Sequence, residues 1–276
     1  MRKYLFLSLS VLVVTAAAAR EFWLEPTRFQ VLPGAQVHIR RLIGSNFQGE
    51  AWAGKRNRLI SFWHFAPGQP PASLLALPTA SDTLASTVTL AQPGTHLLAL
   101  TTDNAYLSLS AADFAAYVEQ ENLQATGTQP PSPDNATKLV RESYRRCAKT
   151  LVQAGPAVLT DTARAWARVL NLPLELVPEQ NPYTLAPGAA FTVRVLRSGR
   201  PVAGQPVALW LRGHRPQALL HRLRSNQNGR VLFRLSEAGE YLASTVYLQP
   251  TPSGFPADWQ STWSTLTFGI VGKKRP

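Results

Sequence analysis

Apolar and polar residues alternate with a period of two along many short stretches of this chain, which is the pattern of strands that bury one face. In the clearest case, Val231, Phe233 and Leu235 alternate with more exposed-looking neighbours such as Arg234. Turns separate these stretches, and the chain holds 17 Gly and 22 Pro among many Val, Leu and Thr. The pattern predicts a mainly β protein built from short strands.

A Pro-Gly turn followed by an alternating strand occurs twice, in Leu32–Arg40 and again in Ala186–Arg194. A glycine turn that enters a strand also occurs twice and in the same order, in Gln92–Ala99 and Glu237–Ser244. Proline presets φ and glycine supplies the positive φ that reverses the chain, so both suit the corners between strands. The repeats predict two related β-sandwiches; the alternative is a chance resemblance between strand starts.

The second repeat carries further hairpin signals. Gly199–Val207 holds a Gly-x-Pro-x-x-Gly entry to a strand, Ser225–Gly229 ends in an Asn-Gly corner, and Gly239-Glu240-Tyr241 begins the next strand. This order resembles the transthyretin-like or carboxypeptidase-regulatory-like sandwich. Such modules usually display or bind, so the resemblance implies a binding role for this half of the chain.

Between the repeats the apolar spacing changes to that of helices. Ser110 is a good N-cap with Asp113 three residues on, and Gly127–Pro133 ends the helix that follows. A second helix is predicted over 136–153, because four residues fall on one helical stripe: Val140, Tyr144, Cys147 and Leu151. Basic residues on the opposite arc predict a solvated face, or alternatively a seat for an acidic partner: Lys138, Arg141, Arg145, Arg146 and Lys149.

The start of the chain has the form of a secretory leader. Arg2 and Lys3 precede an apolar run over 4–14, and Ala17–Ala19 offers a small-x-small cleavage site. The run is shorter than the roughly 20 residues of a spanning helix, which argues against the alternative of a membrane anchor. We expect cleavage before Arg20, a secreted or periplasmic protein, and no transmembrane segment after the leader is removed.

These signals divide the chain into a signal peptide (1–19), an N-terminal β-sandwich (20–109), a helical connector (110–172), a C-terminal β-sandwich (173–270) and a basic tail (271–276). The expected fold class is mainly β, with two Ig-like or transthyretin-like β-sandwiches joined by a short helical segment. The mature length is enough for two small sandwiches that each bury a core.

Composition narrows the chemistry. The single cysteine, Cys147, excludes an intramolecular disulfide and cysteine-built metal clusters, and its apolar stripe predicts a buried thiol rather than a reactive one. The formal charge of +12 favours an anionic neighbour, with solubility as the alternative reason for it. The basic residues are not interleaved with aromatic ones in a nucleic-acid motif, so we expect no nucleic-acid partner.

No catalytic motif is present: the chain has no Gly-x-Ser-x-Gly, no His-Glu-x-x-His, no phosphate loop and no dinucleotide fingerprint. We therefore predict a protein that is not an enzyme and has no catalytic residues. His38, His64 and His96 are interpreted as half-buried fillers. Trp259 and Trp263 predict a core plug, with a sugar-stacking platform as the alternative.

A basic cluster flanks the predicted C-terminal hairpin without an acidic residue in it: Arg212, His214, Arg215, His221, Arg222 and Arg224. The two histidines of this cluster could bind a metal only if the hairpin happened to place them opposite each other. The cluster otherwise suits an acidic partner.

Several blocks occur in an order that resembles a bacterial periplasmic family, domain of unknown function 4198, grouped with nickel and cobalt uptake components of the NikM type. The blocks are Glu21–Pro26, Phe114–Tyr117, Tyr144–Lys149, Leu172–Pro178, Asn181–Tyr183 and Asp258–Phe268. The resemblance spans nearly all of the mature chain. It implies a non-enzymatic binding or accessory protein linked to nickel or cobalt uptake, with a metal-uptake permease or an envelope protein as partner.

The resemblance also implies a metal site. Members commonly begin the mature protein with histidine and carry a second histidine where this chain has Tyr247; here the first position is Arg20. Arginine has no lone pair to donate, and tyrosine must first lose a proton. The residues left as candidate ligands for Ni²⁺ or Co²⁺ are Glu21 and His38. The alternatives are a cell-envelope interaction module that binds an acidic polymer or protein partner, and a hydrolase of envelope polymers.

Overall fold

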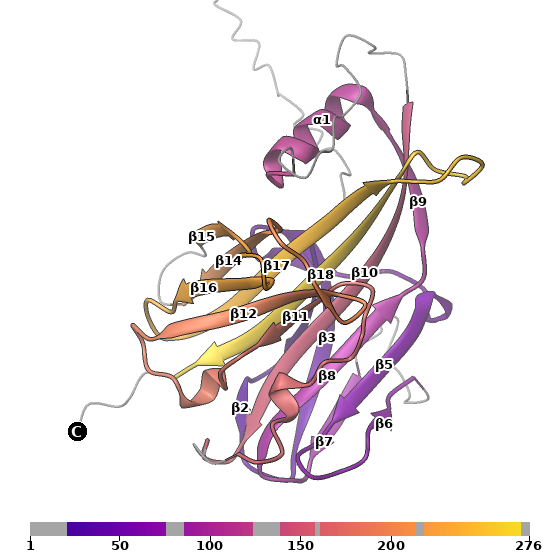
Figure 1. Cartoon of the computed structure of the whole chain (residues 1–276). Coiled ribbons are helices and arrows are strands. Elements are labelled where there is room, and N and C mark those ends of the chain that lie inside the picture. Colours follow the sequence, from indigo (N-terminus) through magenta and orange to yellow (C-terminus); the bar gives the residue numbers. More distant parts are fainter. Residues whose placement is uncertain (1–20, 76–85, 124–138, 158–160, 214–217, 272–276) are drawn as a thin grey trace, which may run out of the picture.

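The computed structural model describes residues 21–75, 86–123, 139–157, 161–213 and 218–271, and these residues form three β-sheets and one α-helix (Figure 1). The fold is mainly β with sandwich-like layers, as predicted. Short 3₁₀ helices are η1 (Arg56–Arg58), η3 (Ala165–Ala167) and η4 (Pro182–Thr184). The predicted leader and residues 272–276 of the tail lie outside the described residues. None of the described helices has the length and apolarity to cross a membrane.

The largest sheet, which we call the central sheet, runs in the order β15-β14-β17-β18-β10-β8-β5-β6, with β2 and β9 also paired to β10. Its strands are β2 (Gln30–Val31), β5 (Leu59–Phe65), β6 (Ala72–Ser73), β8 (Gly94–Thr102), β9 (Ala105–Ser110), β10 (Leu139–Ala154), β14 (Pro206–Arg212), β15 (Ala218–Arg224), β17 (Gly239–Pro250) and β18 (Trp259–Ile270). Strands from both halves of the chain therefore share one sheet.

A smaller sheet covers each face of the central sheet. The N-terminal sheet consists of β1 (Glu21–Pro26), β3 (Ala35–Ser45), β4 (Gln48–Ala51) and β7 (Ser86–Leu90). The C-terminal sheet consists of β11 (Glu175–Pro178), β12 (Ala190–Arg197), β13 (Arg200–Pro201) and β16 (Arg230–Arg234).

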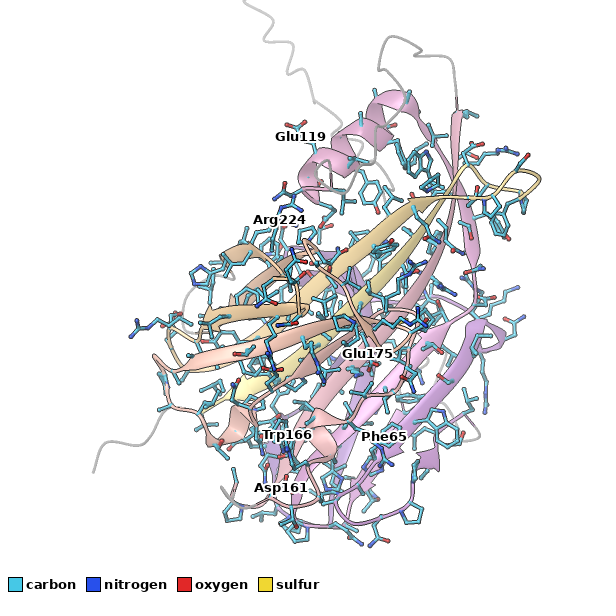
Figure 2. All side chains as sticks on the ribbon, in the orientation of Figure 1. Phe65, Glu119, Asp161, Trp166, Glu175 and Arg224 are labelled. Atoms are coloured by element: carbon cyan, nitrogen blue, oxygen red, sulfur yellow. The ribbon has the colours of Figure 1, made fainter. Side chains whose placement is uncertain are left out.

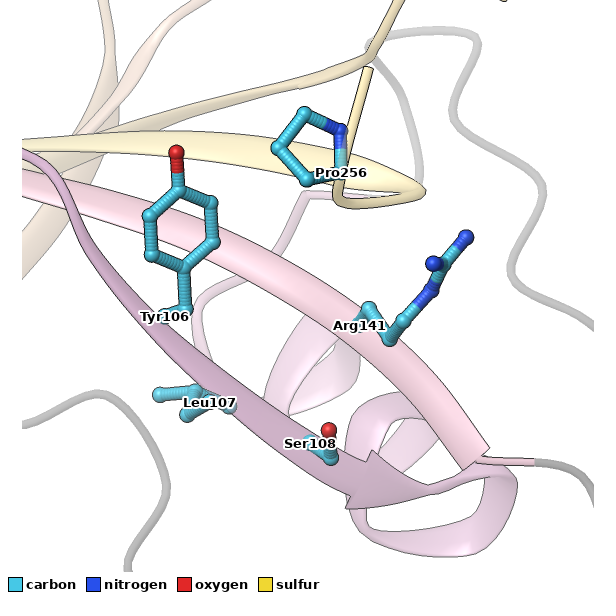
Figure 3. A pocket seen from close by; sticks show the side chains of 5 residues that line it. All are labelled: Tyr106, Leu107, Ser108, Arg141 and Pro256. Atoms are coloured by element: carbon cyan, nitrogen blue, oxygen red, sulfur yellow. The ribbon is translucent and has the colours of Figure 1, made fainter. Parts of the chain in front are cut away.

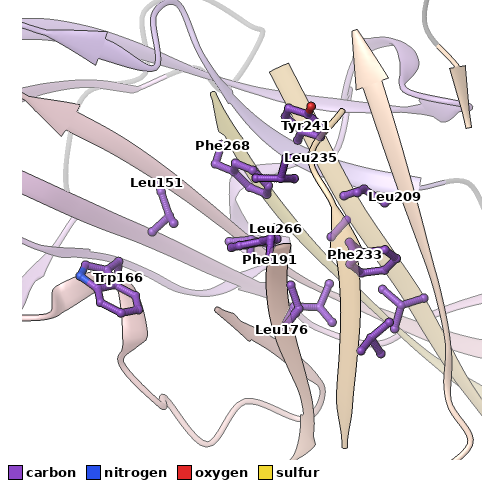
Figure 4. Close-up of a cluster of buried hydrophobic side chains, with 14 of the residues drawn as sticks. Leu151, Trp166, Leu176, Phe191, Leu209, Phe233, Leu235, Tyr241, Leu266 and Phe268 are labelled. Carbon is purple, nitrogen blue, oxygen red and sulfur yellow. The ribbon is translucent and has the colours of Figure 1, made fainter. Parts of the chain in front are cut away.

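Side-chain alternation along the central strands builds one core on each face. On β8, Leu98 packs in a core with Phe22 of the N-terminal sheet. Its neighbour Leu97 points to the other face and joins a core with Phe191 of the C-terminal sheet, the cluster drawn in Figure 4. The molecule is thus three sheets deep, with the central sheet buried on both faces.

The repeated sequence pattern marks equivalent strands. Gly34 and Gly188 both have positive φ, 84° and 89°, and each donates its N–H to the strand that pairs with its own, at Leu90 and Leu235. β10 and β18 then pair in parallel at the middle of the central sheet. The two strands are equivalent, because β10 pairs with β8 as β18 pairs with β17, and β8 and β17 begin at the repeated glycine turns. Equivalent strands that run side by side in parallel are related by a half-turn about their own direction, which exchanges the faces of the sheet. This explains why the two smaller sheets cover opposite faces.

The predicted helix over 136–153 is wrong, because residues Leu139–Ala154 form the long strand β10. β10 pairs with β8 and β9 on one side and with β18 on the other, and the two smaller sheets cover its two faces, so polar residues are buried along with apolar ones. Arg146 and Lys149, assigned to a solvated face, are 4% and 2% exposed. Of the helical connector predicted over 110–172, the described residues keep one α-helix, α1.

Helix α1 (Ala111–Gln120) confirms the first predicted helix. The Ser110 hydroxyl accepts the backbone N–H of Asp113 at 3.0 Å, which is the expected N-cap. Phe114, Tyr117 and Val118 are buried against the central sheet, in a cluster that includes Trp263. The predicted stop at Gly127–Pro133 lies outside the described residues.

Candidate functional site

A small polar cavity lies where the end of α1, the start of β1 and the β3–β4 turn meet the central sheet. We call it the Glu21 cavity; it is lined by Glu21, Ser45, Asn46, Gln120, Glu121, Trp210, Arg222 and Trp263. Its accessible volume is about 20 Å³. That is room for about one water molecule or ion, since one water-sized sphere needs roughly 10–15 Å³.

Strand β1 and helix α1 hold the two carboxyl groups of the cavity. All six residues of β1 are buried, and Glu21 lies in register opposite Gly44 of β3. At the other side, Tyr117 stacks on Trp263 with ring centroids 6.0 Å apart, which seats α1 on β18. Glu121 at the end of α1 then reaches Arg222 of β15 at 3.0 Å.

The Glu21 carboxyl is buried, and one of its two oxygens is left without a partner among the described residues. Ser244 on β17 donates its hydroxyl to Oε1 at 2.5 Å, while Oε2 has no hydrogen-bond partner among the described residues. Burial raises the pKa of Glu21 from its ordinary 4.5 to about 7, and the nearby Glu121 charge adds to this, while hydrogen bonds from Ser244 and the Phe47 backbone and the charge of Arg222 oppose it. Burial also raises the pKa of Glu121, against the effect of Arg222.

A third buried carboxyl lies on β10. Ser261 of β18 donates a hydrogen bond to Glu142 Oε1, and Oε2 is unpaired within the described part of the chain. Burial raises the pKa of Glu142 to about 7. Its charge is one cause of the raised pKa of Tyr117, after burial itself, which places Glu142 beside the helix that closes the cavity.

Two indole N–H groups at the cavity are also buried without a hydrogen-bond partner among the described residues. They are Nε1 of Trp210 and Nε1 of Trp263. Buried polar groups are normally paired, so a cluster of unpaired ones around a cavity indicates a missing water, ion or ligand. The unpaired oxygen of Glu21 can be satisfied by a hydrogen-bond donor or a cation, whereas the indole N–H groups need an acceptor such as a water molecule.

The structure does not bring Glu21 and His38 together. Glu21 lies opposite Gly44 and His38 lies six residues earlier on β3, which is about 20 Å along a strand. The His38 ring bonds the Thr87 hydroxyl at 3.2 Å, at an exposed site. Among the described residues no group of three or more His, Cys, Asp or Glu side chains is placed to hold a metal ion.

Tyr247, at the second histidine position of the family resemblance, does not face the cavity. It packs against the core under the C-terminal sheet, and its ring lies 4.4 Å from the Arg197 guanidinium carbon. Ser244 of the same strand points to the cavity from the opposite face. Arg20, His214 and Arg215 lie outside the described residues.

Two histidines form a pair that the sequence did not reveal. Nε2 of His64 on β5 and Nδ1 of His96 on β8 are 2.8 Å apart, and both rings are buried. Burial lowers the pKa of both, that of His64 to about 4, so the pair is neutral at ordinary pH. Only the pairing of β5 with β8 brings them together, and this register is not readable from the local pattern.

Of the two tryptophans near the C-terminus, Trp263 is a core residue and Trp259 is partly buried against the same cluster. Trp263 is 2% exposed and stacks on Tyr117, and Trp259 packs on Phe114 at 5.5 Å. The sugar-platform alternative therefore loses its support.

A wider, open hollow lies nearby along β9 and β10. Figure 3 shows its lining: Tyr106, Leu107, Ser108, Arg141 and Pro256, around about 530 Å³. Its one charged side chain, Arg141, is paired with Asp258 at 2.9 Å and is not free for a ligand.

Fold and cavity together define a mainly β protein of three stacked sheets with a small, charged internal site beneath a helix. The chain belongs to the family described as domain of unknown function (DUF4198), whose model matches residues 17–249. The curated proteins include no match to this sequence.

Solved structures show only distant likeness. The D0-D1 domain of intimin is 13% identical, with 90% of this chain and 97% of that one covered, at a TM-score of 0.20. Trypsin-activated alpha-2-macroglobulin from Escherichia coli is 12% identical over 91% of this chain and 15% of its own, at 0.22. Three N-terminal domains of the bacteriophage RB49 outer capsid protein Hoc are 8% identical over 92% and 100%, also at 0.22. These scores are too low to relate the folds.

Proposed function

We propose that this protein is a secreted or periplasmic, non-enzymatic binding or accessory protein that holds a small cation in the Glu21 cavity. One observation carries the proposal: a buried carboxylate oxygen, Glu21 Oε2, is left unpaired beside a second carboxyl, Glu121. Burial and the charge of Glu121 raise the pKa of Glu21, so a cation bound beside these two carboxyls would stabilise the ionised form of Glu21.

The size of the cavity supports an ion as the ligand. A space of about 20 Å³ excludes molecules of drug size, whose pockets are roughly 300 Å³ or larger. Because the pKa of Glu21 is raised to about 7, this carboxyl keeps its proton up to about neutral pH, and cation binding must release that proton. Affinity for the cation is therefore expected to rise with pH.

Nickel or cobalt is the cargo that the family resemblance implies. The donors that line the cavity are carboxyl, amide and hydroxyl oxygens, whereas these metals favour nitrogen ligands such as imidazole. Cleavage after Ala19 would free an α-amino nitrogen one residue before Glu21, which is the nearest such donor along the chain. A metal-uptake permease is the partner that fits this proposal.

Calorimetric titration of the mature chain with Ni²⁺, Co²⁺, Mg²⁺ and Ca²⁺ tests the proposal. We expect saturable binding of at least one of these ions at pH 8, lost in Glu21→Gln and weaker at pH 6. Glu119→Gln is the matched control, because Glu119 lies on the same helix but points into solvent (Figure 2). Heat from no ion contradicts the proposal, and unchanged binding in Glu21→Gln places the site elsewhere.

The second candidate function is a cell-envelope interaction module for an acidic polymer or protein partner. It is favoured by the surplus of 28 basic over 16 acidic residues and by an open sheet edge that carries some of that charge. This function does not require the Glu21 cavity.

A further inference from the structure

Strand β15 (Ala218–Arg224) ends the central sheet. It pairs with β14 alone, so one row of its backbone N–H and C=O groups has no strand partner among the described residues. The edge strand of the C-terminal sheet, β16, lies next to it, and β16 pairs with β12 only. Two open edges therefore lie side by side at one end of the sandwich.

An apolar hollow lies between these two edges. It measures about 560 Å³ and is lined by Gly188, Ala190, His221, Leu223, Leu232, Phe233 and Arg234. Leu223 is 39% exposed and Leu232 is 62% exposed, which is unusual for leucines grouped in a hollow. The aromatic floor comes from Phe233, on which the His221 ring stacks.

The charge of the hollow has one sign. Arg234 is its only fully charged lining residue, and His221 can add to it; no acidic side chain of the described residues lines the hollow. The surface of the hollow is thus complementary to an apolar segment that carries negative charge.

The edge has one common protection, a bulge at Leu220 where the β14–β15 register shifts, and the regular stretch from His221 to Arg224 beyond it is open. Natural proteins block open edges with charged side chains placed across them. The arginines of β15 do not serve this purpose, because Arg222 pairs with Glu121 and Arg224 bonds to Asn122 at the end of α1. Figure 2 shows Arg224 in that position, between β15 and the helix.

We propose that β15 is a strand-addition site, where an extended segment of a partner protein, apolar at alternate positions and acidic in between, extends the central sheet. Backbone hydrogen bonds to the open edge supply affinity, and the inward side chains of the segment fill the hollow beside Leu223 and Phe233. Arg234 lies exposed at the rim of the hollow, where its charge attracts a segment of net negative charge. This inference rests on the interaction-module function and is independent of cation binding.

The test uses a fluorescein-labelled nonapeptide of alternating valine and glutamate as the probe, with fluorescence polarisation as the readout. We expect saturable binding to the full mature chain and slower amide hydrogen exchange in 218–224 on binding. A valine–lysine peptide, and a valine–glutamate peptide interrupted by proline, are expected to bind at least about tenfold more weakly.

Two variants locate the binding. Leu223→Lys and Arg234→Glu are each expected to weaken the valine–glutamate probe about tenfold, a change of roughly 1.4 kcal/mol. Their matched controls, Leu139→Lys and Arg200→Glu, change exposed residues away from the hollow and are expected to leave affinity unchanged. Arg234 is exposed, so this variant is expected to fold, and it should gain affinity for the valine–lysine peptide.

The possible failures are distinguishable. Equal binding of the acidic and basic peptides, or unchanged binding in both variants, overturns the strand-addition site. If the peptide binds without slowing amide exchange in 218–224, the interaction-module function stands and only the site at β15 is contradicted. If the protein dimerises and Leu223→Lys abolishes the dimer, the edge binds a second copy of the chain, which contradicts a separate partner. Glu21→Gln is expected to bind the peptide normally.

Discussion

At the scale of single residues, the distinctive feature is a set of buried acids near α1. Glu21, Glu121 and Glu142 all have raised pKa values, with burial as the main cause. An acid whose pKa is raised by folding binds its proton more tightly in the folded state. Its ionisation therefore opposes folding, and a bound cation would offset that cost.

This predicts an inverted pH dependence of stability. Between the unfolded pKa of Glu21 near 4.5 and the folded value of about 7, the folded state binds more protons, so stability falls as pH rises through this window. The loss is about 3 kcal/mol at pH 8. Thermal unfolding at a series of pH values from 5 to 8, with a chelator present to remove metal ions, measures this loss of stability. Glu21→Gln is expected to make the profile shallower, leaving the contribution of Glu142, and Glu119→Gln to preserve it; a Glu21→Gln profile as steep as that of the parent protein contradicts the assignment.

At the scale of elements, a buried ion pair joins the central sheet to the C-terminal sheet. Nζ of Lys149 on β10 donates to Glu175 on β11, and both side chains are at most 2% exposed. The Glu175 carboxylate also accepts the backbone N–H of Leu170, about 3.1 Å away. The pair thus fixes β11 and the chain before it over β10.

Breaking one side of this pair leaves a buried charge without a counterion. Glu175→Gln is expected to lower the free energy of unfolding by about 3–5 kcal/mol in urea titrations. The double variant Lys149→Met with Glu175→Leu is expected to recover most of that loss. Glu179→Gln, which breaks the exposed pair with Arg230, is expected to cost less than about 1 kcal/mol. If Glu175→Gln and Glu179→Gln lowered the free energy of unfolding equally, the buried pair would contribute no more to stability than the exposed pair.

At the scale of the whole molecule, the two repeats form one continuous structure. The parallel pairing of β10 with β18 makes the middle of the central sheet from one strand of each half. β1 of the first half also lies over β18, where the Thr267 hydroxyl donates to the Leu24 carbonyl at 2.7 Å. Neither half can lose the other without exposing a long strand edge.

We therefore expect the halves to depend on each other. Chains 20–156 and 157–276, produced separately, are expected to show no cooperative thermal unfolding, while the mixture or the intact mature chain shows a single transition. Circular dichroism and size-exclusion chromatography measure this. If each fragment alone unfolded cooperatively at the temperature of the intact chain, the shared sheet would contribute little to stability.

The fold class, the repeated strand corners and the cap of α1 follow from the amino-acid sequence alone, because each depends on local chemistry. Gly34 and Gly188 supply positive φ wherever the chain must turn, and Ser110 caps whatever helix follows it. Glu21 was a candidate from its place in a family block, whereas Glu121, Arg222 and Trp210 were not recognised as parts of one site.

Only the tertiary structure decided the rest. Leu139–Ala154 has a helical spacing of apolar residues, yet it is a strand, because a strand buried on both faces has no solvent side to impose a period of two. The Glu21 cavity and the His64–His96 pair join residues from strands and a helix far apart along the chain. Their assembly follows from sheet order and register, which are set by how the layers pack and not by any local stretch of sequence.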